Sequence, residues 1–269
     1  MRILIKLMIA TFLIAASGPV SAHYVTGEEI VNGMRKTEAY TADGATYGPY
    51  EWTYKYKRSF DGVSLTKHVE INFVFDDTYT AEEQATYKTT AEKDIERIWN
   101  NKFVIRDGDK KFPILVDVTT AGPFDQTVNV SKNAGVTDML NWYATHTNGG
   151  NTDLPGVRAH EFGHMLGLFD EYIGGAVDKF PNPTLSDHGL MGSGTYDEKP
   201  VMHERYYQQY LDYIRTLNPD TDHSFRLVSA VPEPIAAFLL AAGLLAMALH
   251  RMGGRTRSCV PCVPSSGKP

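Results

Sequence analysis

Residues 69–75 alternate between hydrophobic and polar side chains and then become continuously apolar, a pattern typical of a strand buried in a sheet. Asp76 and Asp77 mark the end of this strand. The next residues match a capping box, in which the side chains of Thr80 and Glu83 each bind the backbone N–H of the other residue. A helix is therefore predicted from Thr80 to about Asn100, with an inward face that consists of Ala91, Ile95 and Ile98.

Further along the chain, the pattern predicts strands at residues 112–118 and 127–130 and a hairpin turn at residues 106–109. The strand at 127–130 is the expected edge against which an extended peptide would pair. Residues 172–199 are rich in glycine and are expected to form a loop. Residues 202–217 have helical periodicity, with a stripe expected to face the core that consists of Tyr206, Tyr210, Ile214 and Leu217. Together these elements indicate an α+β fold.

The segment His160-Glu161-Phe162-Gly163-His164 combines two metal-ligand types with a catalytic base. On a helix, residues four apart lie on one face, so His160 and His164 can bind a single ion. Glu161 then projects beside the ion, where it can take a proton from a water and pass it to a leaving amine. The loop at residues 148–153 is expected to cap this helix. The spacing predicts a catalytic zinc helix.

A catalytic zinc site usually has three protein ligands and one open position, so a third ligand is needed. Gly167 can end the helix by adopting a left-handed backbone conformation, which turns the chain and lets Asp170 reach the same ion. Asp170 is therefore the predicted third ligand. A glutamate from a later segment, Glu198 or Glu204, is the alternative, and the spacing of Gly167 and Asp170 argues against it.

The eleven residues from His160 to Asp170, H-E-x-x-H-x-x-G-x-x-D, resemble the zinc signature of the metzincin metallopeptidases, in the variant with aspartate as third ligand. The resemblance implies a twisted mixed β-sheet with a backing helix and an active-site helix, followed by a small, mostly irregular or helical C-terminal subdomain. It also implies a methionine turn beneath the metal. Met191, in Gly-Leu-Met-Gly-Ser, is the candidate for the hydrophobic floor under the histidines, and Met202 is its competitor.

These residues together predict a zinc-dependent endopeptidase that acts on protein or peptide substrates. Zn²⁺ would polarise the scissile carbonyl and lower the pKa of water, and Glu161 would act as general base and then protonate the leaving amine. Neither Tyr196 nor His188 has a spacing that identifies it as an oxyanion donor. The alternative is a noncatalytic surface or matrix protein with a structural zinc, which would need a fourth ligand such as His188 or His203.

The N-terminus predicts export. Residues 1–22 contain basic Arg2 and Lys6, an apolar run at residues 7–16 and the small-x-small sequence Val20-Ser21-Ala22, as in a signal peptide. Cleavage by signal peptidase would leave His23 as the first residue. The expected metallopeptidase domain, residues 23–230, contains no cysteine, so its stability must come from its core rather than from disulfides.

The C-terminus has a Pro-Glu-Pro sequence, an apolar run at residues 235–249 and then Arg251, Arg255 and Arg257. This arrangement, residues 231–257, resembles the PEP-CTERM sorting signal of Gram-negative bacteria. The resemblance implies processing by an exosortase, transient anchoring in the inner membrane through residues 235–249, and a location in the cell envelope or extracellular matrix. The apolar run is short for a permanent span. Residues 258–269, which contain both cysteines, are expected to be a disordered tail.

The expected domain is acidic. Residues 23–230 contain 20 Lys and Arg against 31 Asp and Glu, so the net charge is −11. Such a domain is a poor candidate for binding nucleic acid. The acidity fits a soluble exported protein, although it also suits basic peptides.

Overall fold

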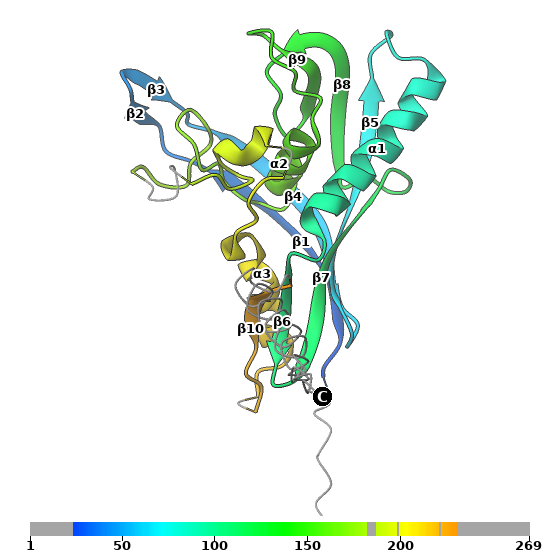
Figure 1. Cartoon of the computed structure of the whole chain (residues 1–269), viewed down its shortest axis with the longest axis vertical. Helices are drawn as coiled ribbons and strands as arrows, with labels where there is room; N and C mark the ends of the chain where they lie inside the picture. The colour runs from blue at the N-terminus through cyan, green and yellow to red at the C-terminus, as the bar shows by residue number, and fades with distance from the viewer. Residues whose placement is uncertain (1–23, 182–186, 198, 221, 231–269) are drawn as a thin grey trace, which may run out of the picture.

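The computed structural model describes residues 24–181, 187–197, 199–220 and 222–230 (Figure 1). The expected signal peptide, sorting signal and C-terminal tail lie outside the described residues. Within the described part of the chain, no helix is both long enough and apolar enough to cross a membrane.

A strongly curled, mixed eight-stranded sheet organises an α+β fold (Figure 1). Its strand order is β1-β4-β5-β7-β6-β10, and β8 and β9 extend it from the second half of β5. β5 is parallel to β7 and β8, and β8 is parallel to β9, whereas the other neighbours are antiparallel. A separate hairpin consists of β2 (Tyr40–Ala42) and β3 (Ala45–Tyr47). The sheet strands are β1 (Gly27–Lys36), β4 (Glu51–Phe60), β5 (Leu65–Phe75), β6 (Phe103–Asp107), β7 (Lys110–Thr119), β8 (Gln126–Gly135), β9 (Asn141–His146) and β10 (Arg226–Ser229).

The strand predicted at residues 69–75 is confirmed as part of β5, the central strand of the sheet. Its residues alternate between buried and half-buried along most of its length because one face packs on the core. The predicted turn at residues 106–109 is also confirmed. It joins β6 to β7 with Asp107 opposite Lys110, and Gly108 adopts the left-handed conformation, with φ +56°, that such a turn requires.

The predicted backing helix is confirmed as α1 (Ala81–Trp99). Both bonds of the capping box between Thr80 and Glu83 are present, and Asn100 ends the helix. The predicted inward residues Ala91, Ile95 and Ile98 are buried. The Trp99 indole donates a 3.0 Å hydrogen bond to the carbonyl oxygen of Ala159, which ties α1 to the helix that carries the candidate site.

The edge position predicted for residues 127–130 is wrong. β8 is longer than expected and pairs with β5 on one side and with β9 on the other, with Asn129 opposite Asn141. β9 has no clear strand pattern in the sequence, because its residues Asn-Trp-Tyr-Ala-Thr-His do not alternate between apolar and polar side chains and all but one of them are half-buried. Among the described strands, β9 is therefore the outermost one at this end of the sheet.

The C-terminal helix is shorter than predicted. A 3₁₀ turn (Glu204–Tyr207) leads into α3 (Gln208–Leu217), so residues 202 and 203 precede both. The aromatic stripe faces the core as expected, because Tyr206, Tyr210 and Ile214 are buried. Among the described residues between the candidate site and Glu204, the one helical element is a 3₁₀ turn at Ser193–Tyr196.

Candidate metal centre

α2 (Pro155–Met165) carries both histidines. Pro155 occupies its first position, where a helix needs no N–H donor and the proline ring fixes a suitable φ. Leu154 is the N-cap residue and no side chain caps the helix, so the expected cap from residues 148–153 is wrong. Every residue from 156 to 165 is buried, which shows that packing on all sides stabilises this short helix.

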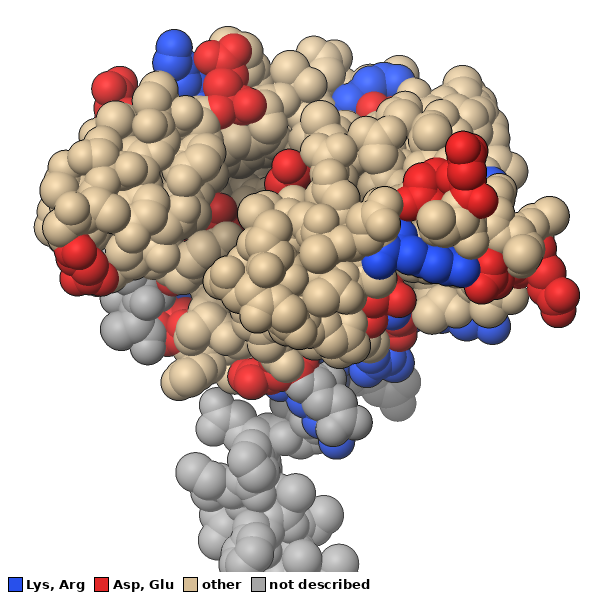
Figure 2. Space-filling view, turned by 90° about the horizontal axis from the view of Figure 1, so that it is seen from above, with Lys and Arg blue, Asp and Glu red and all other residues tan. Residues whose placement is uncertain are grey.

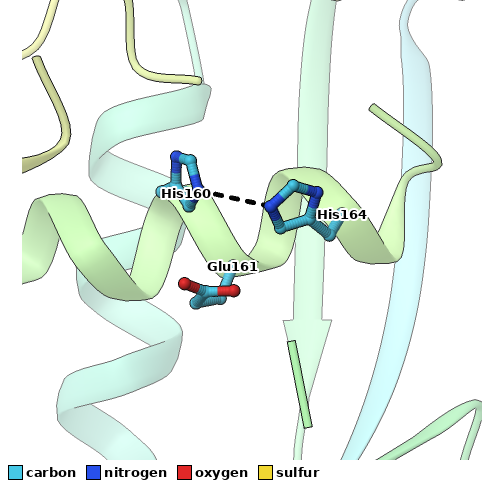
Figure 3. A group of neighbouring side chains, drawn as sticks. All are labelled: His160, Glu161 and His164. Atoms are coloured by element: carbon cyan, nitrogen blue, oxygen red, sulfur yellow. Dashed lines mark hydrogen bonds between the residues drawn. The ribbon is translucent and has the colours of Figure 1, made fainter. Parts of the chain in front are cut away.

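The imidazoles of His160 and His164 face each other (Figure 3), with their Nε2 atoms 3.2 Å apart. Each Nδ1 lies 2.9 Å from a backbone carbonyl oxygen, that of Leu190 for His160 and that of Leu168 for His164. Because a carbonyl only accepts hydrogen bonds, each Nδ1 carries the proton and each Nε2 presents a lone pair. Two lone pairs at this separation repel unless a proton or a cation lies between them. The pair is therefore arranged as metal ligands are.

Gly167 and Asp170 have the arrangement that the sequence predicts. Gly167 has φ +80° and follows the end of α2, so the chain reverses there. The reversal places Asp170 Oδ1 3.0 Å from His160 Nε2 and 3.3 Å from His164 Nε2. Asp170 Oδ2 accepts a 2.6 Å hydrogen bond from the backbone N–H of Ala176, which fixes the carboxylate in this position.

The three atoms form a triangle with edges of 3.0, 3.2 and 3.3 Å. In a tetrahedral zinc site with bonds of about 2.0–2.1 Å, two ligand atoms lie about 3.3 Å apart. The triangle is therefore close to the size of one face of a zinc tetrahedron. Within the described part of the chain, the only cluster of at least three side chains placed to hold a metal is the one around His160, Glu161 and His164. Asp170 joins it as the carboxylate in contact with both imidazoles.

Glu161 lies beside the two imidazoles on the same helix (Figure 3). It is 5 % exposed, and its Oε2 atom has no hydrogen-bond partner among the described residues. Burial raises the pKa of Glu161, the two histidines lower it, and the charges of Asp170 and Asp138 raise it again, so that the net shift is upward. A buried carboxylate with an unused oxygen and a raised pKa suits a group that must accept and then release a proton.

The side chains of His164 and Asp170 shift the pKa of each other. Burial alone would lower the pKa of His164, but Asp170 and then Glu161 raise it to about 9. Burial alone would raise the pKa of Asp170, yet the two histidines hold it far below its usual range. Asp170 therefore stays ionised, as a metal-ligating carboxylate must be. A divalent cation would replace the protons that otherwise neutralise this group.

Met191 is fully buried against α2. A Cβ atom on Gly163 would lie 2.3 Å from Met191 Sδ, so the side chain fills the space directly over this glycine. The backbone N–H of Glu171 donates a 2.7 Å hydrogen bond to the carbonyl oxygen of Met191, which links this turn to the residue after Asp170. Met202, the competitor, is half-buried at the margin of the core.

Other residues considered from the sequence lie elsewhere. His188, Tyr196 and Glu204 are exposed, and His203 contacts Asp187 with 3.4 Å between its Nε2 atom and a carboxylate oxygen. Glu198 lies outside the described residues. Among the described candidates, none therefore lies at the site as a fourth ligand, and the residues whose ligand atoms lie within 3.3 Å of one another are His160, His164 and Asp170.

Several groups that hydrogen-bond to the candidate site come from distant parts of the chain, and the sequence pattern does not predict them. The Trp52 indole donates a hydrogen bond to the carbonyl oxygen of His164, and the Arg35 guanidinium donates one to that of Gly167. Thr195 Oγ1 lies 3.0 Å from His160 Nδ1. Arg35 and Trp52 lie on β1 and β4, more than 110 positions earlier in the chain, and no local sequence signal connects them to α2.

A cleft of about 390 Å³ opens onto these groups. Its walls are residues 50–52, residues 136–141 between β8 and β9, and the segment that follows Asp170, while Glu161 and His164 lie at its floor. The top view in Figure 2 shows a hollow on this face with acidic side chains in and around it.

Comparison of the chain with protein-family models, curated proteins and solved structures gives no match in any of the three.

Proposed function

We propose that this protein is a zinc-dependent endopeptidase. The observation that carries the proposal is the position of Asp170 Oδ1, which completes a zinc-sized triangle with the two Nε2 atoms while the Glu161 carboxylate next to it keeps an unpaired oxygen. A structural zinc site needs four protein ligands and no base, whereas this site has three ligands, a base and an open cleft.

In the proposed mechanism, His160, His164 and Asp170 hold Zn²⁺. When bound, the ion supplies Lewis acidity to the scissile carbonyl and to water. Glu161 accepts a proton from the attacking water and then donates it to the leaving amine. The buried position of Glu161 keeps its pKa raised, so both transfers are accessible to the same carboxyl group. The cleft walls position the peptide and exclude bulk water.

The same residues support a metzincin-type site, which we include in the proposal. Gly167 turns the chain towards Asp170, and Met191 packs under the zinc helix. In this interpretation, Met191 is the floor of the site and Gly163 is the small residue that makes room for it.

We also propose that the protein is exported and sorted through its two ends. Signal peptidase would cleave after Ala22, and an exosortase would process residues 231–257 at the inner membrane of a Gram-negative bacterium. Intact-mass and N-terminal analysis of the protein recovered from its own cell envelope tests this proposal. A protein that retains Met1 and residues 258–269 would contradict it.

The test of the peptidase proposal compares the parent protein, Glu161→Gln and the matched control Glu204→Gln for zinc content and for cleavage of a mixed peptide library. We expect about one zinc per chain in all three, with cleavage by the parent and the control and a loss of at least about 10³-fold in Glu161→Gln, because the general base is removed. If all three bind zinc and none cleaves any peptide, the noncatalytic surface protein is the correct interpretation.

A further inference from the structure

The walls of the cleft expose apolar side chains on opposite sides. Val136 and Leu140 lie on the wall between β8 and β9 and are 60 % and 42 % exposed. Tyr172 lies on the facing wall and is 37 % exposed. Large apolar side chains that flank a cleft favour an apolar ligand group between them, because contact removes their surface from water.

Of the four charged residue types, only Asp and Glu are found among the described residues that line the cleft. Glu51 and Asp138 lie on its walls and Glu161 and Asp170 at its floor, and the described lining residues include no Lys or Arg. With Zn²⁺ counted as +2, these four carboxylates leave a formal charge of −2, which becomes −1 when Lys36, the ion-pair partner of Glu51, is included. The field of such a cleft attracts cations and repels anions.

The two wall carboxylates are held differently. Asp138 accepts a 2.8 Å hydrogen bond from the backbone N–H of Leu140, so its charge is fixed at the mouth of the cleft. Among the described residues, Glu51 forms an ion pair with Lys36, whose Nζ atom lies 3.7 Å from the carboxylate, and both side chains are more than half exposed. An ion pair of this kind is weak and exchanges readily with a charged ligand.

We infer that the cleft selects peptides in which a bulky apolar side chain is adjacent to Lys or Arg, and that it rejects acidic sequences, with Glu51 and Asp138 as the specificity-determining carboxylates. This inference rests on the proposed peptidase function and names its substrate class. The floor carboxylates act in catalysis and metal binding, whereas the wall carboxylates face the substrate side chains that flank the scissile bond.

The test uses three fluorogenic peptides that differ at one position next to a leucine, with Lys, Asn or Glu there. We expect kcat/KM to fall by about tenfold from the Lys to the Glu peptide, with Asn between them. Glu51→Lys should abolish most of this preference. The control Glu28→Lys makes the same charge change on β1, away from the cleft, and should keep it.

A second readout separates this inference from the function on which it rests. Binding of the same peptides, labelled with a fluorophore, is measured by anisotropy with the Glu161→Gln variant. Equal cleavage of the Lys and Glu peptides by the parent protein would overturn the inference and leave the peptidase intact. Preferential binding of the Lys peptide by Glu161→Gln, together with no cleavage of any peptide by the parent protein, would support the selectivity and overturn the proposed peptidase function.

Discussion

The indole nitrogen of Trp52 donates a 3.1 Å hydrogen bond to the backbone carbonyl oxygen of His164, and the edge-to-face contact of the two rings brings their centroids to 5.5 Å. Trp52 lies on β4 and His164 near the end of α2, 112 positions later. The same carbonyl oxygen also accepts a 2.8 Å hydrogen bond from the backbone N–H of Gly167, so the indole supplies its second bond. A strand near the N-terminus thus contacts the backbone of a candidate metal ligand.

Trp52→Phe should weaken zinc binding. The substitution keeps an aromatic ring but removes the donor to His164, and loss of such supporting bonds typically lowers metal affinity by about 10–100-fold. Competition with a chromophoric chelator measures the affinity. Trp142→Phe is the matched control, because the Trp142 indole N–H is buried and has no partner among the described residues. Equal zinc affinities in the two variants would show that the Trp52 bond does not support the site.

Gly163→Ala should destabilise the protein by about 1–3 kcal/mol, the usual range for overpacking a core. The new methyl group would collide with Met191 Sδ, since the ideal Cβ position lies only 2.3 Å from it. Urea unfolding measures the loss. Gly150→Ala is the control, because its Cβ would meet no atom within 4 Å. In the double variant, Met191→Ala removes the atom with which the new methyl group collides. Gly163→Ala should therefore lower the free energy of unfolding by less in the Met191→Ala background than in the parent protein. Equal losses in the two backgrounds would contradict the packing argument.

The buried side chain of Lys67 makes the free energy of unfolding depend on pH. It is fully buried, with Nζ over the rings of Tyr56 and Tyr210 and 2.8 Å from Gln209 Oε1. Burial holds the pKa of Lys67 well below its usual 10.5. Between the folded and unfolded pKa values the unfolded chain binds the extra proton, so the contribution of Lys67 to stability rises with pH and is least favourable below the folded value.

Lys67→Met should therefore raise stability at pH 7 by about 1–3 kcal/mol, since apolar replacements of buried charges are often stabilising. The Gln209 side chain keeps its hydrogen bond from the Tyr56 hydroxyl in this variant. Urea unfolding of both proteins at pH 6, 7, 8 and 9 gives the difference, which should shrink as pH rises. A constant difference across this range would show that the pKa of Lys67 in the folded protein lies above it, which would contradict a pKa held well below 10.5.

The features that were predicted correctly depend on residues close in sequence. The capping box of α1, the alternation along β5 and the eleven residues from His160 to Asp170 each encode their geometry within one or two turns or one strand. Gly167 is the clearest case, because its left-handed φ alone redirects the chain towards the metal triangle. For such features, local physics and tertiary structure agree.

The features that were missed depend on distant contacts. β1 and β4 are ten residues long, yet polar side chains fill many of their positions, so the hydrophobic pattern is weak. The hydrogen-bond partners of the two imidazoles come from Leu190, Leu168 and Thr195, of which only Leu168 is near α2 in sequence. The motif thus predicts the ligands, and the fold supplies the groups that orient them.

Asp170→Asn tests the ligand assignment directly. The amide keeps the size of the carboxylate and can still accept the hydrogen bond from Ala176, but it lacks the charge that zinc requires. We expect zinc affinity to fall by at least about 100-fold. At a zinc concentration below the dissociation constant of the variant, zinc should no longer raise its melting temperature, because a ligand stabilises the native state only when its concentration is comparable to or above its dissociation constant. Glu204→Gln, which removes the alternative ligand, should bind zinc as tightly as the parent. If Glu204→Gln loses zinc and Asp170→Asn retains it, the third ligand comes from the later segment and the triangle around Asp170 is a metal-free ion-pair network.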